Sequence, residues 1–376
     1  MQGVTAISLG QDGSSPPFPN IRYWMDTVEQ IGSGVHIIPF VGHGSLRLMS
    51  PVRFQRDPAP AAMDSMTWLM EDALRAGVWG LSLGLEYTPG LYAPRTELEQ
   101  LAKVLAEYDG MIMSHIRNED DEGVEEALQE LLDLGAWVPV HVSHMKSVYG
   151  KGPDRARQIL RLLGAARKKG YQVTADIYPY IASYTTIGIL FPDWARPPRS
   201  FGRVMRRREA ELDTFLRRRI VRRNGPEATL FGAGPYTGQT LAQVAEAKHK
   251  RPERVLMEDI GPTGASAAYF VMDSLLQLEL LQDSLTNICS DGSPTMRHPR
   301  GYGSFARIIE VVVVQDSVLT LEEAIRKMSA LPAQTLGMAR RGQIAPGYIA
   351  DMVLFDPQNI KAHATYAEPH QLATGM

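Results

Sequence analysis

Four polar side chains stand at the ends of predicted β-strands, where they could form a hydrolytic site. They are His115 in MIMSHIRNE, His144 in VPVHVSHMK, Asp176 in VTADIYPY and Asp291 in NICSDGSP. Zinc takes nitrogen and oxygen ligands, and in catalytic sites it keeps one position for a water whose pKa falls to about 7. Two imidazoles with nearby carboxylates therefore predict metal-assisted hydrolysis. A lone histidine after a strand is more often a hydrogen-bonded core or loop residue, so the prediction depends on the joint placement of these groups.

The remaining histidines have ordinary explanations. His141 has the opposite parity from His144 on the same strand, so we expect it to be packed or to support the site. His298 in MRHPRGYG shapes the loop near the site. Structural or surface roles are expected for His36, His43, His249, His363 and His370.

Short apolar or β-branched runs alternate with longer amphipathic stretches along the chain. The predicted strands are Val4–Leu9, Val35–Val41, Trp79–Leu85, Met111–Ile116, Val138–His144, Gln172–Tyr178 and Thr286–Ser290. Amphipathic stretches such as Glu97–Glu107 and Gly123–Leu134 lie between most of them, which predicts an α/β fold with parallel strands and crossover helices. In a parallel barrel the carboxyl ends of the strands open on one face and would gather the polar residues there. Seven strands are one fewer than a closed (β/α)8 barrel needs, and the pattern alone also permits a doubly wound sheet.

Two further segments lie outside this alternation. Residues 192–285 are mostly helical and basic, and we interpret them as an excursion between the last two barrel strands. After a predicted helix at Leu321–Ser329, the segment RRGQIAPGYIADMVLFDP predicts turns and two strands of a small β appendage.

Composition excludes several classes of protein. The chain has 376 residues, 44% of them hydrophobic, and a net charge of -3, so it is not expected to bind nucleic acid. We interpret the basic run Arg203–Arg223 as a solvated helix face with interleaved acids. Cys289 is the single cysteine, no apolar run reaches the about 18 residues of a membrane span, and MQGVTAISLG lacks the features of a signal peptide. We therefore expect a cytoplasmic protein that acts on a small molecule, with its oligomeric state left open.

Nine segments in order resemble the N-acyl-D-amino-acid deacylases, the D-aminoacylase branch of the amidohydrolase superfamily. They are GVTAISLGQDGSSP, VGHGSLR, WGLSLGLEYTPGLYA, MSHIRNED, HVSHMK, DIYPY, SDGSPTMRHPRGYGSF, LEEAIRKMSALPAQTLGM and RGQIAPGYIADMVLFDP. The resemblance implies a metal-dependent (β/α)8 TIM barrel over residues 1–338, here with strands two to eight. It also implies that residues 339–376 are part of a small β-sandwich.

The resemblance also implies the roles of individual residues. His115 and His144 match the two histidines that bind one tightly held Zn²⁺, and Asp291 matches the aspartate that serves as general base and then acid. The residues that match the family's grip on the substrate carboxylate are Lys146, Tyr87, Tyr178 and Arg300. A guanidinium, an ammonium and phenolic donors together suit a carboxylate. The implied reaction is hydrolysis of an N-acyl-D-amino acid to a D-amino acid and a carboxylate.

The sequence departs from the family pattern in two places. Asp12 of GQDG stands where the family has a cysteine ligand in a GNCG-like turn, and aspartate is a competent oxygen ligand for zinc. Cys289 does not replace that cysteine. The H-x-H pair of the family's first strand is absent, so a second metal site is not expected. We therefore expect a truncated form that lacks the first barrel strand and is weakly active or inactive by itself.

Two alternatives stay open at this point. One is a hydrolase of cyclic amides, similar to dihydropyrimidinases and hydantoinases. These enzymes usually carry a carboxylated lysine, and the fourth strand, WGLSLGL, ends without a lysine. The other is a catalytically inactive remnant kept as a binding or structural protein. The preferred acyl group and amino-acid side chain are not evident from the sequence, because an enzyme selective for acidic substrates needs one more cation that the sequence does not locate.

Overall fold

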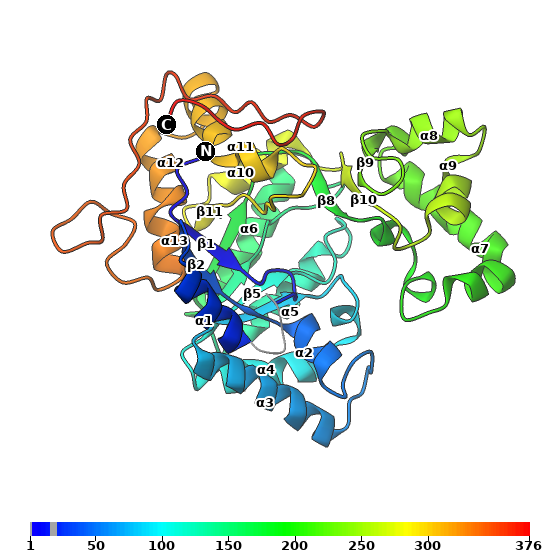
Figure 1. The fold of residues 1–376 in the computed structure, drawn as a ribbon, viewed down its shortest axis with the longest axis horizontal. Helices are drawn as coiled ribbons and strands as arrows, with labels where there is room; N and C mark the ends of the chain where they lie inside the picture. The colour runs from blue at the N-terminus through cyan, green and yellow to red at the C-terminus, as the bar shows by residue number, and fades with distance from the viewer. Residues whose placement is uncertain (1, 16–20) are drawn as a thin grey trace.

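Parallel strands with helices between them form the body of the protein, shown as a computed structural model in Figure 1. The structure describes residues 2–15 and 21–376. In chain order the parallel strands are β1 (Ala6–Leu9), β2 (His36–Pro39), β3 (Val41–Gly42), β4 (Gly80–Gly84), β5 (Met111–His115), β6 (Val140–Val142), β7 (Val173–Ile177) and β11 (Thr286–Ile288). Only Phe40 separates β2 from β3, so these segments occupy seven strand positions. All seven predicted strands are confirmed.

The strands follow each other around an incomplete barrel. β1 pairs with β2, and the order continues β3-β4-β5-β6-β7-β11, with every pair parallel. Among the described residues β1 has no partner other than β2, and β11 has none other than β7. The ring is therefore open between β1 and β11, as expected for a barrel without its first strand.

Amphipathic helices cover the outside of the strands. The crossover helices are α3 (Pro60–Ala76), α4 (Arg95–Ala106), α5 (Val124–Leu134), α6 (Gly152–Lys168) and α10 (Ser274–Leu281), and each contacts the next around the ring. In α5 the buried residues Val124, Ala127, Leu128 and Leu131 recur at helical spacing and face the strands. Every residue of β4 and β5 is buried, as expected for parallel strands covered on both faces.

The remaining helices of the barrel lie toward the amino and carboxyl ends of the sequence. They are α1 (Ile21–Ile31), α2 (His43–Met49), α11 (Arg300–Arg307), α12 (Leu321–Met328) and α13 (Ala330–Thr335). The predicted helix at 321–329 is thus confirmed by α12. None of the helices within the described residues is both long and apolar enough to cross a membrane.

A separate lobe is inserted between β7 and β11 and projects to the right in Figure 1. It contains an antiparallel sheet of β8 (Ser183–Thr186), β10 (Ser266–Tyr269) and β9 (Thr229–Ala233), together with α7 (Phe201–Arg222), α8 (Leu241–Ala247) and α9 (Pro252–Arg254). The lobe has its own apolar cluster, which includes Phe191, Leu216, Val244 and Leu256. Sequence analysis predicted the helical part of this excursion but not its sheet.

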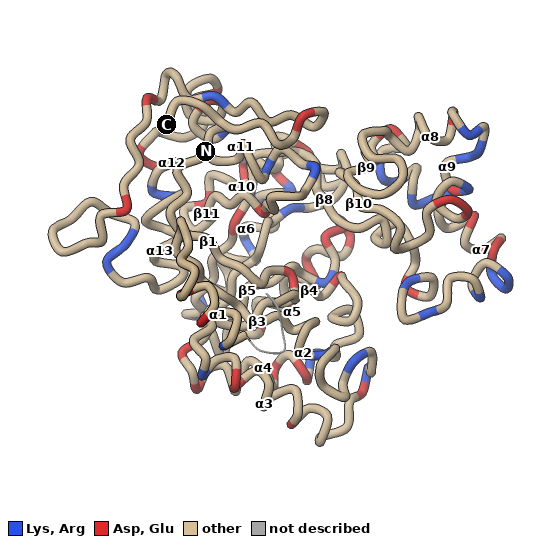
Figure 2. The backbone as a smooth tube through the Cα atoms, in the orientation of Figure 1, with Lys and Arg blue, Asp and Glu red and all other residues tan. Residues whose placement is uncertain are grey.

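The basic helix α7 behaves as predicted. Its buried residues are Val204, Leu212, Asp213, Leu216 and Ile220. Most of its arginines are exposed, and Arg208 and Arg217 pair with acidic residues of the same helix. Figure 2 shows basic and acidic positions interleaved along this helix. The run is therefore a solvated helix face with interleaved acids.

The segment 339–376 differs from the prediction. It runs along the surface and contains no strand, and its one β-bridge joins Lys361 and Thr374. The two strands predicted within RRGQIAPGYIADMVLFDP are wrong. Ile344 and Leu354 are 92% and 93% exposed, so these side chains have no facing layer to pack against. The domain boundary after residue 338, between the barrel and the segment 339–376, stays a prediction.

Candidate active site

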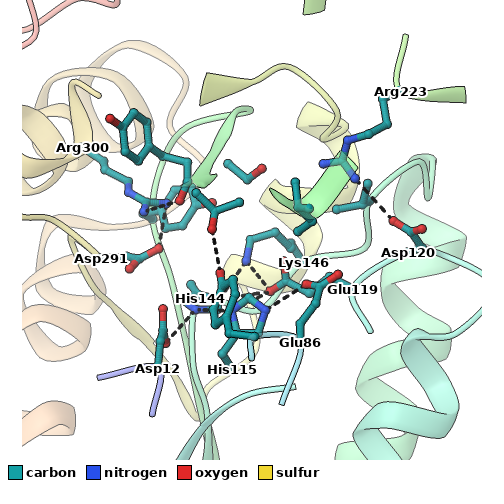
Figure 3. A pocket seen from close by; sticks show the side chains of 17 residues that line it. Asp12, Glu86, His115, Glu119, Asp120, His144, Lys146, Arg223, Asp291 and Arg300 are labelled. Atoms are coloured by element: carbon teal, nitrogen blue, oxygen red, sulfur yellow. Dashed lines mark hydrogen bonds and ion pairs between the residues drawn. The ribbon is translucent and has the colours of Figure 1, made fainter. Parts of the chain in front are cut away.

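The eight residues to which the family resemblance assigned roles line one pocket at the carboxyl ends of the barrel strands, whereas Asp176 does not line it. The eight are Asp12, Tyr87, His115, His144, Lys146, Tyr178, Asp291 and Arg300. His115 is the last residue of β5, His144 follows β6 by two positions, and Tyr178 directly follows β7. The parallel topology thus brings together side chains that are far apart in the sequence (Figure 3).

Three of these side chains meet with the geometry of a metal site. The Nδ1 atom of His115 lies 3.1 Å from Nε2 of His144, which in turn lies 3.2 Å from Oδ1 of Asp12. Ligand atoms on a tetrahedral zinc ion with bonds of about 2.0–2.1 Å lie roughly 3.3 Å apart. The two nitrogens and one oxygen are therefore spaced to hold one ion, and this donor set suits zinc.

The backbone at the site is held in unusual conformations. Asp12, His144 and Asp291 all have positive φ angles, of 53°, 38° and 45°. Left-handed backbone is uncommon for residues other than glycine and clusters at functional sites, where the surrounding structure imposes it. The turn that carries Asp12 also approaches β4 closely, because a Cβ atom at Gly84 would lie 2.0 Å from the Asp12 carbonyl oxygen.

Carboxylates contact the second ring nitrogen of each imidazole and so orient the two rings. The Nε2 atom of His115 is 3.0 Å from Glu86, and Nδ1 of His144 is 3.2 Å from Glu119. Metal-binding histidines commonly donate their second ring N–H to a carboxylate, which fixes the ring and its tautomer. Lys146 donates to Glu119 at 2.6 Å and lies 2.8 Å from Nδ1 of His144.

These buried charges shift one another's pKa values. Burial and the Lys146 ammonium oppose protonation of His144, but the Asp291 and Asp12 carboxylates outweigh them and raise the His144 pKa to about 10. Burial favours the neutral form of Asp12, yet the charge of His144 dominates and lowers the Asp12 pKa to about 2. For Glu119, burial is likewise overcome, chiefly by Lys146, and its pKa lies well below the usual value.

Asp291 lies on another wall of the pocket, next to Arg300. Its Oδ2 atom is 2.7 Å from the Arg300 guanidinium, which also lies over the ring of Tyr178 at 4.6 Å. Burial raises the pKa of Asp291, and the opposing charges of Arg300 and His144 do not fully compensate. Burial raises the Tyr178 pKa to about 12, so its phenol stays a hydrogen-bond donor at neutral pH.

The other candidates have structural roles. Asp176 accepts hydrogen bonds from the backbone N–H of His144 and from Nε2 of His141, and so supports the turn that carries His144. His141 is thus packed beside the site, as expected. His298 lies between the carbonyl of Ala182 and the N–H of Arg300, which fits a loop-shaping role.

The remaining histidines and the cysteine lie outside the ligand cluster. His43 is buried against Glu97 at 2.7 Å, and Arg47 donates to the same carboxylate. Burial, followed by the Asp176 and Asp291 carboxylates, raises the pKa of the Cys289 thiol well above its usual value. A thiol with such a pKa resists forming the thiolate that zinc binds, so Cys289 is a poor ligand.

The chain is similar in sequence to known proteins. The profile of the Amidohydrolase family matches residues 279–369. The whole chain is 34% identical to the N-acyl-D-glutamate deacylase of Alcaligenes xylosoxydans xylosoxydans and covers 72% of that protein. The chain belongs to the D-aminoacylase family of amidohydrolases. A second relative in this family, the D-aminoacylase of the same organism, is 30% identical, and the alignment covers 98% of this chain and 71% of the relative.

Solved structures of the D-aminoacylase family have the same fold. The N-acyl-D-glutamate deacylase of Bordetella bronchiseptica, solved with zinc and a phosphonate inhibitor that mimics the tetrahedral intermediate, is 30% identical, with a TM-score of 0.85. The match covers this whole chain and 77% of that structure. A D-aminoacylase crystal structure, 28% identical, matches over the same shares with a TM-score of 0.82. The predicted α/β barrel of this family is therefore confirmed.

Sequence analysis missed four charged residues that line the pocket, Glu86, Glu119, Asp120 and Arg223. Glu86 directly precedes Tyr87, and Glu119 lies four residues after His115, so both belong to motifs that were recognised for other residues. A carboxylate close to a predicted ligand was the signal available for these two. Arg223 comes from the lobe, and no sequence signal connects it to the barrel.

Proposed function

We propose that this protein hydrolyses the amide bond of N-acyl-D-amino acids with the help of zinc, giving a D-amino acid and a carboxylate. The observation that carries the proposal is the convergence of His115, His144 and Asp12 at ligand spacing in the predicted pocket. The preference for the D form is supported by the names of the relatives, N-acyl-D-glutamate deacylase and D-aminoacylase.

His115, His144 and Asp12 would hold the ion. When bound, zinc supplies Lewis acidity, which polarises a carbonyl group and lowers the pKa of water. Glu86 and Glu119 keep the two imidazole rings aimed at a common point. With Asp12 in place of a cysteine the site still has three ligands. The aspartate supplies a hard oxygen ligand where a cysteine would supply a soft sulfur ligand.

The substrate carboxylate would bind on the wall formed by Arg300, Lys146 and Tyr178. Arg300 and Lys146 bring positive charge, and the Nε atom of Arg300 is buried without a hydrogen-bond partner within residues 2–15 and 21–376. A guanidinium with a free donor suits a carboxylate. Tyr87 packs against the His115 ring at 4.5 Å and accepts a hydrogen bond from Thr185, so we assign it to the shape of the pocket floor.

Asp291 is the group that we assign to proton transfer. As a carboxylate it would take a proton from the attacking water and then give this proton to the leaving nitrogen as the C–N bond breaks. Its raised pKa favours this exchange, because a carboxyl group with a pKa nearer neutrality both accepts and returns a proton more readily. Arg300 holds the carboxylate in place at 2.7 Å.

The test combines metal content with turnover. Purified protein loaded with Zn²⁺ should release amino acid from N-acetyl-D-amino acids, release much less from the L-enantiomers, and leave hydantoin unchanged. Zinc binding without any N-acyl-amino-acid hydrolysis would contradict the proposed reaction, and hydantoin opening would favour the cyclic-amide alternative. A cytoplasmic location and the absence of nucleic-acid and membrane partners remain predictions from the sequence.

A further inference from the structure

His298 does not line the pocket itself, but it contacts the backbone of Arg300, which does. The residue belongs to the loop between β11 and α11 and is 0% exposed. Its Nδ1 atom lies 3.1 Å from the backbone nitrogen of Arg300, and its Nε2 atom lies 3.0 Å from the carbonyl oxygen of Ala182. The ring therefore joins the start of α11 to the segment that leads into β8.

These two partners determine the form of the imidazole. A carbonyl oxygen only accepts hydrogen bonds and a backbone N–H only donates them, so Nε2 carries the hydrogen and Nδ1 is the acceptor. Burial, followed by the charge of Arg300, holds the pKa of His298 well below its usual range. The ring thus stays neutral and keeps the acceptor that the Arg300 N–H needs.

Four tyrosine rings enclose this imidazole. They meet it edge-on with ring centroids between 5.1 and 6.3 Å away, and they are Tyr178, Tyr180, Tyr184 and Tyr366. This edge-to-face arrangement is one that aromatic rings prefer. Tyr178 follows β7, Tyr184 lies in β8, and Tyr366 comes from the carboxyl-terminal segment. Because three separate parts of the chain fix the ring, His298 can serve as a rigid support.

The backbone of Arg300 depends on this support. Arg300 is the first residue of α11, and the first N–H groups of a helix have no carbonyl partner within that helix. Pro299, the residue before the helix, supplies no side-chain cap. The Nδ1 atom of His298 therefore satisfies an N–H group that would otherwise be buried without a partner.

The other end of Arg300 carries the charge that the proposed reaction uses. Its guanidinium is 2.7 Å from Asp291 and lies over the ring of Tyr178 at 4.6 Å. Figure 3 shows the side chain directed at the Asp291 carboxylate. Because Arg300 is only 2% exposed, its side chain has little room to compensate for a movement of its backbone. A shift at the start of α11 would thus affect both groups that Arg300 serves, Asp291 and the substrate carboxylate.

We infer that His298 is a positioning residue, which fixes the backbone of Arg300 so that the guanidinium meets both the substrate carboxylate and Asp291. This inference rests on the proposed amide hydrolysis and adds a residue to it. It goes beyond the shaping of a loop, because it assigns the effect to one ring nitrogen, Nδ1. The other nitrogen only ties the ring to Ala182.

Three variants of the zinc-loaded protein separate the two ring nitrogens. His298→Leu removes both hydrogen bonds, and for the N-acetyl-D-amino acid that the unmodified protein hydrolyses best, KM should rise and kcat should fall. Each change should be about two- to tenfold, the range for one neutral hydrogen bond. His298→Asn can place an amide oxygen near the position of Nδ1 and should restore much of both constants.

His298→Gln is the matched control. Its longer amide can donate to the carbonyl of Ala182 from near the position of Nε2 but leaves the Arg300 N–H without an acceptor, so it should resemble His298→Leu. Bound zinc should be the same in all three variants. A smaller fraction of folded protein would lower the apparent kcat but would not change KM, so a general loss of stability cannot produce the expected pattern.

Two results would overturn the inference and leave the amide hydrolysis intact. One is a KM for His298→Asn that is no lower than that of His298→Leu. The other is full recovery in His298→Gln, which would assign the role of His298 to its bond with Ala182. If the unmodified protein hydrolyses no N-acyl amino acid at all, the proposed function is refuted together with the inference.

Discussion

Replacing Glu86 with leucine removes the carboxylate that holds the His115 ring. Glu86 is 9% exposed, and its oxygen is 3.0 Å from Nε2 of His115, so this is a largely buried, charge-assisted hydrogen bond. Such a bond contributes about 1.5–3 kcal/mol. At about 1.4 kcal/mol for each factor of ten, its loss should weaken zinc binding by about ten- to a hundredfold. The same range is typical when the partner of a metal-binding histidine is removed.

Competition with a chromophoric chelator measures this change directly and does not depend on turnover. Glu86→Gln is the matched control, because it keeps an acceptor oxygen but loses the charge. Its zinc affinity should lie between those of the unmodified protein and Glu86→Leu. Thermal unfolding of each variant checks that the barrel remains folded. A zinc dissociation constant for Glu86→Leu within about twofold of the original protein would refute the positioning role, since the lost bond would then have no share in holding the ring.

Three further predictions concern other parts of the protein. Asp12→Ala removes one of the three proposed ligands and should reduce bound zinc, measured by atomic emission after dialysis; Asp12→Cys should restore it, and full zinc retention in the alanine variant would exclude Asp12 as a ligand. Asp291→Asn should lower kcat by about 10²- to 10⁴-fold with zinc content unchanged, because a proton carrier is lost; an undiminished kcat would assign proton transfer elsewhere. The pKa values of His43 and Glu97 are both lowered in the folded protein. For His43 the cause is burial, which disfavours the charged imidazole. For Glu97 burial would raise the pKa, but the interactions of its carboxylate with His43 and then Arg47 outweigh that effect. The unfolded chain therefore binds more protons, so the free energy of unfolding should fall with acid, below about pH 6.5 for His43 and below about pH 4.5 for Glu97. Urea titrations from pH 7 to pH 4 check this, and Glu97→Gln should be less stable by about 3–5 kcal/mol because it leaves a buried arginine unpaired.

The barrel could be predicted because its strands carry a strong local signal. Segments such as Gly80–Gly84 and Met111–His115 are buried on both faces, so each appears as an apolar run between turn residues. The lobe sheet has no such signal. Ser183–Thr186 and Ser266–Tyr269 consist mostly of small or polar residues, and they pair only because the chain returns after a long helical segment.

The opposite error occurred near the carboxyl end. The run Asp351–Phe355 has the composition of a strand, but strand formation needs a neighbour, and no described strand pairs with it. Composition therefore predicted a tendency that tertiary structure does not fulfil.

The candidate site divides in a similar way. Residues at strand ends could be predicted, because a parallel topology alone brings His115 and His144 to one face. Arg223 could not, because its place in the pocket depends on where the inserted lobe lies in three dimensions. For Glu86 the available signal was its position next to Tyr87 in a recognised motif. The position of Asp12 is likewise a tertiary property, since its turn lies against Gly84 of β4, which is far away in the sequence.

The close approach of Gly84 to the Asp12 carbonyl has a consequence for how this protein can evolve. The absence of a side chain at position 84 allows the turn of Asp12 to lie against β4, so the position of this proposed ligand depends on a glycine of another strand. A random library at position 84, selected for zinc retention, should return glycine alone, although this residue has no side chain with which to touch the metal. Descendants of this sequence are therefore freer to exchange the ligand at position 12 than to alter the glycine beside it.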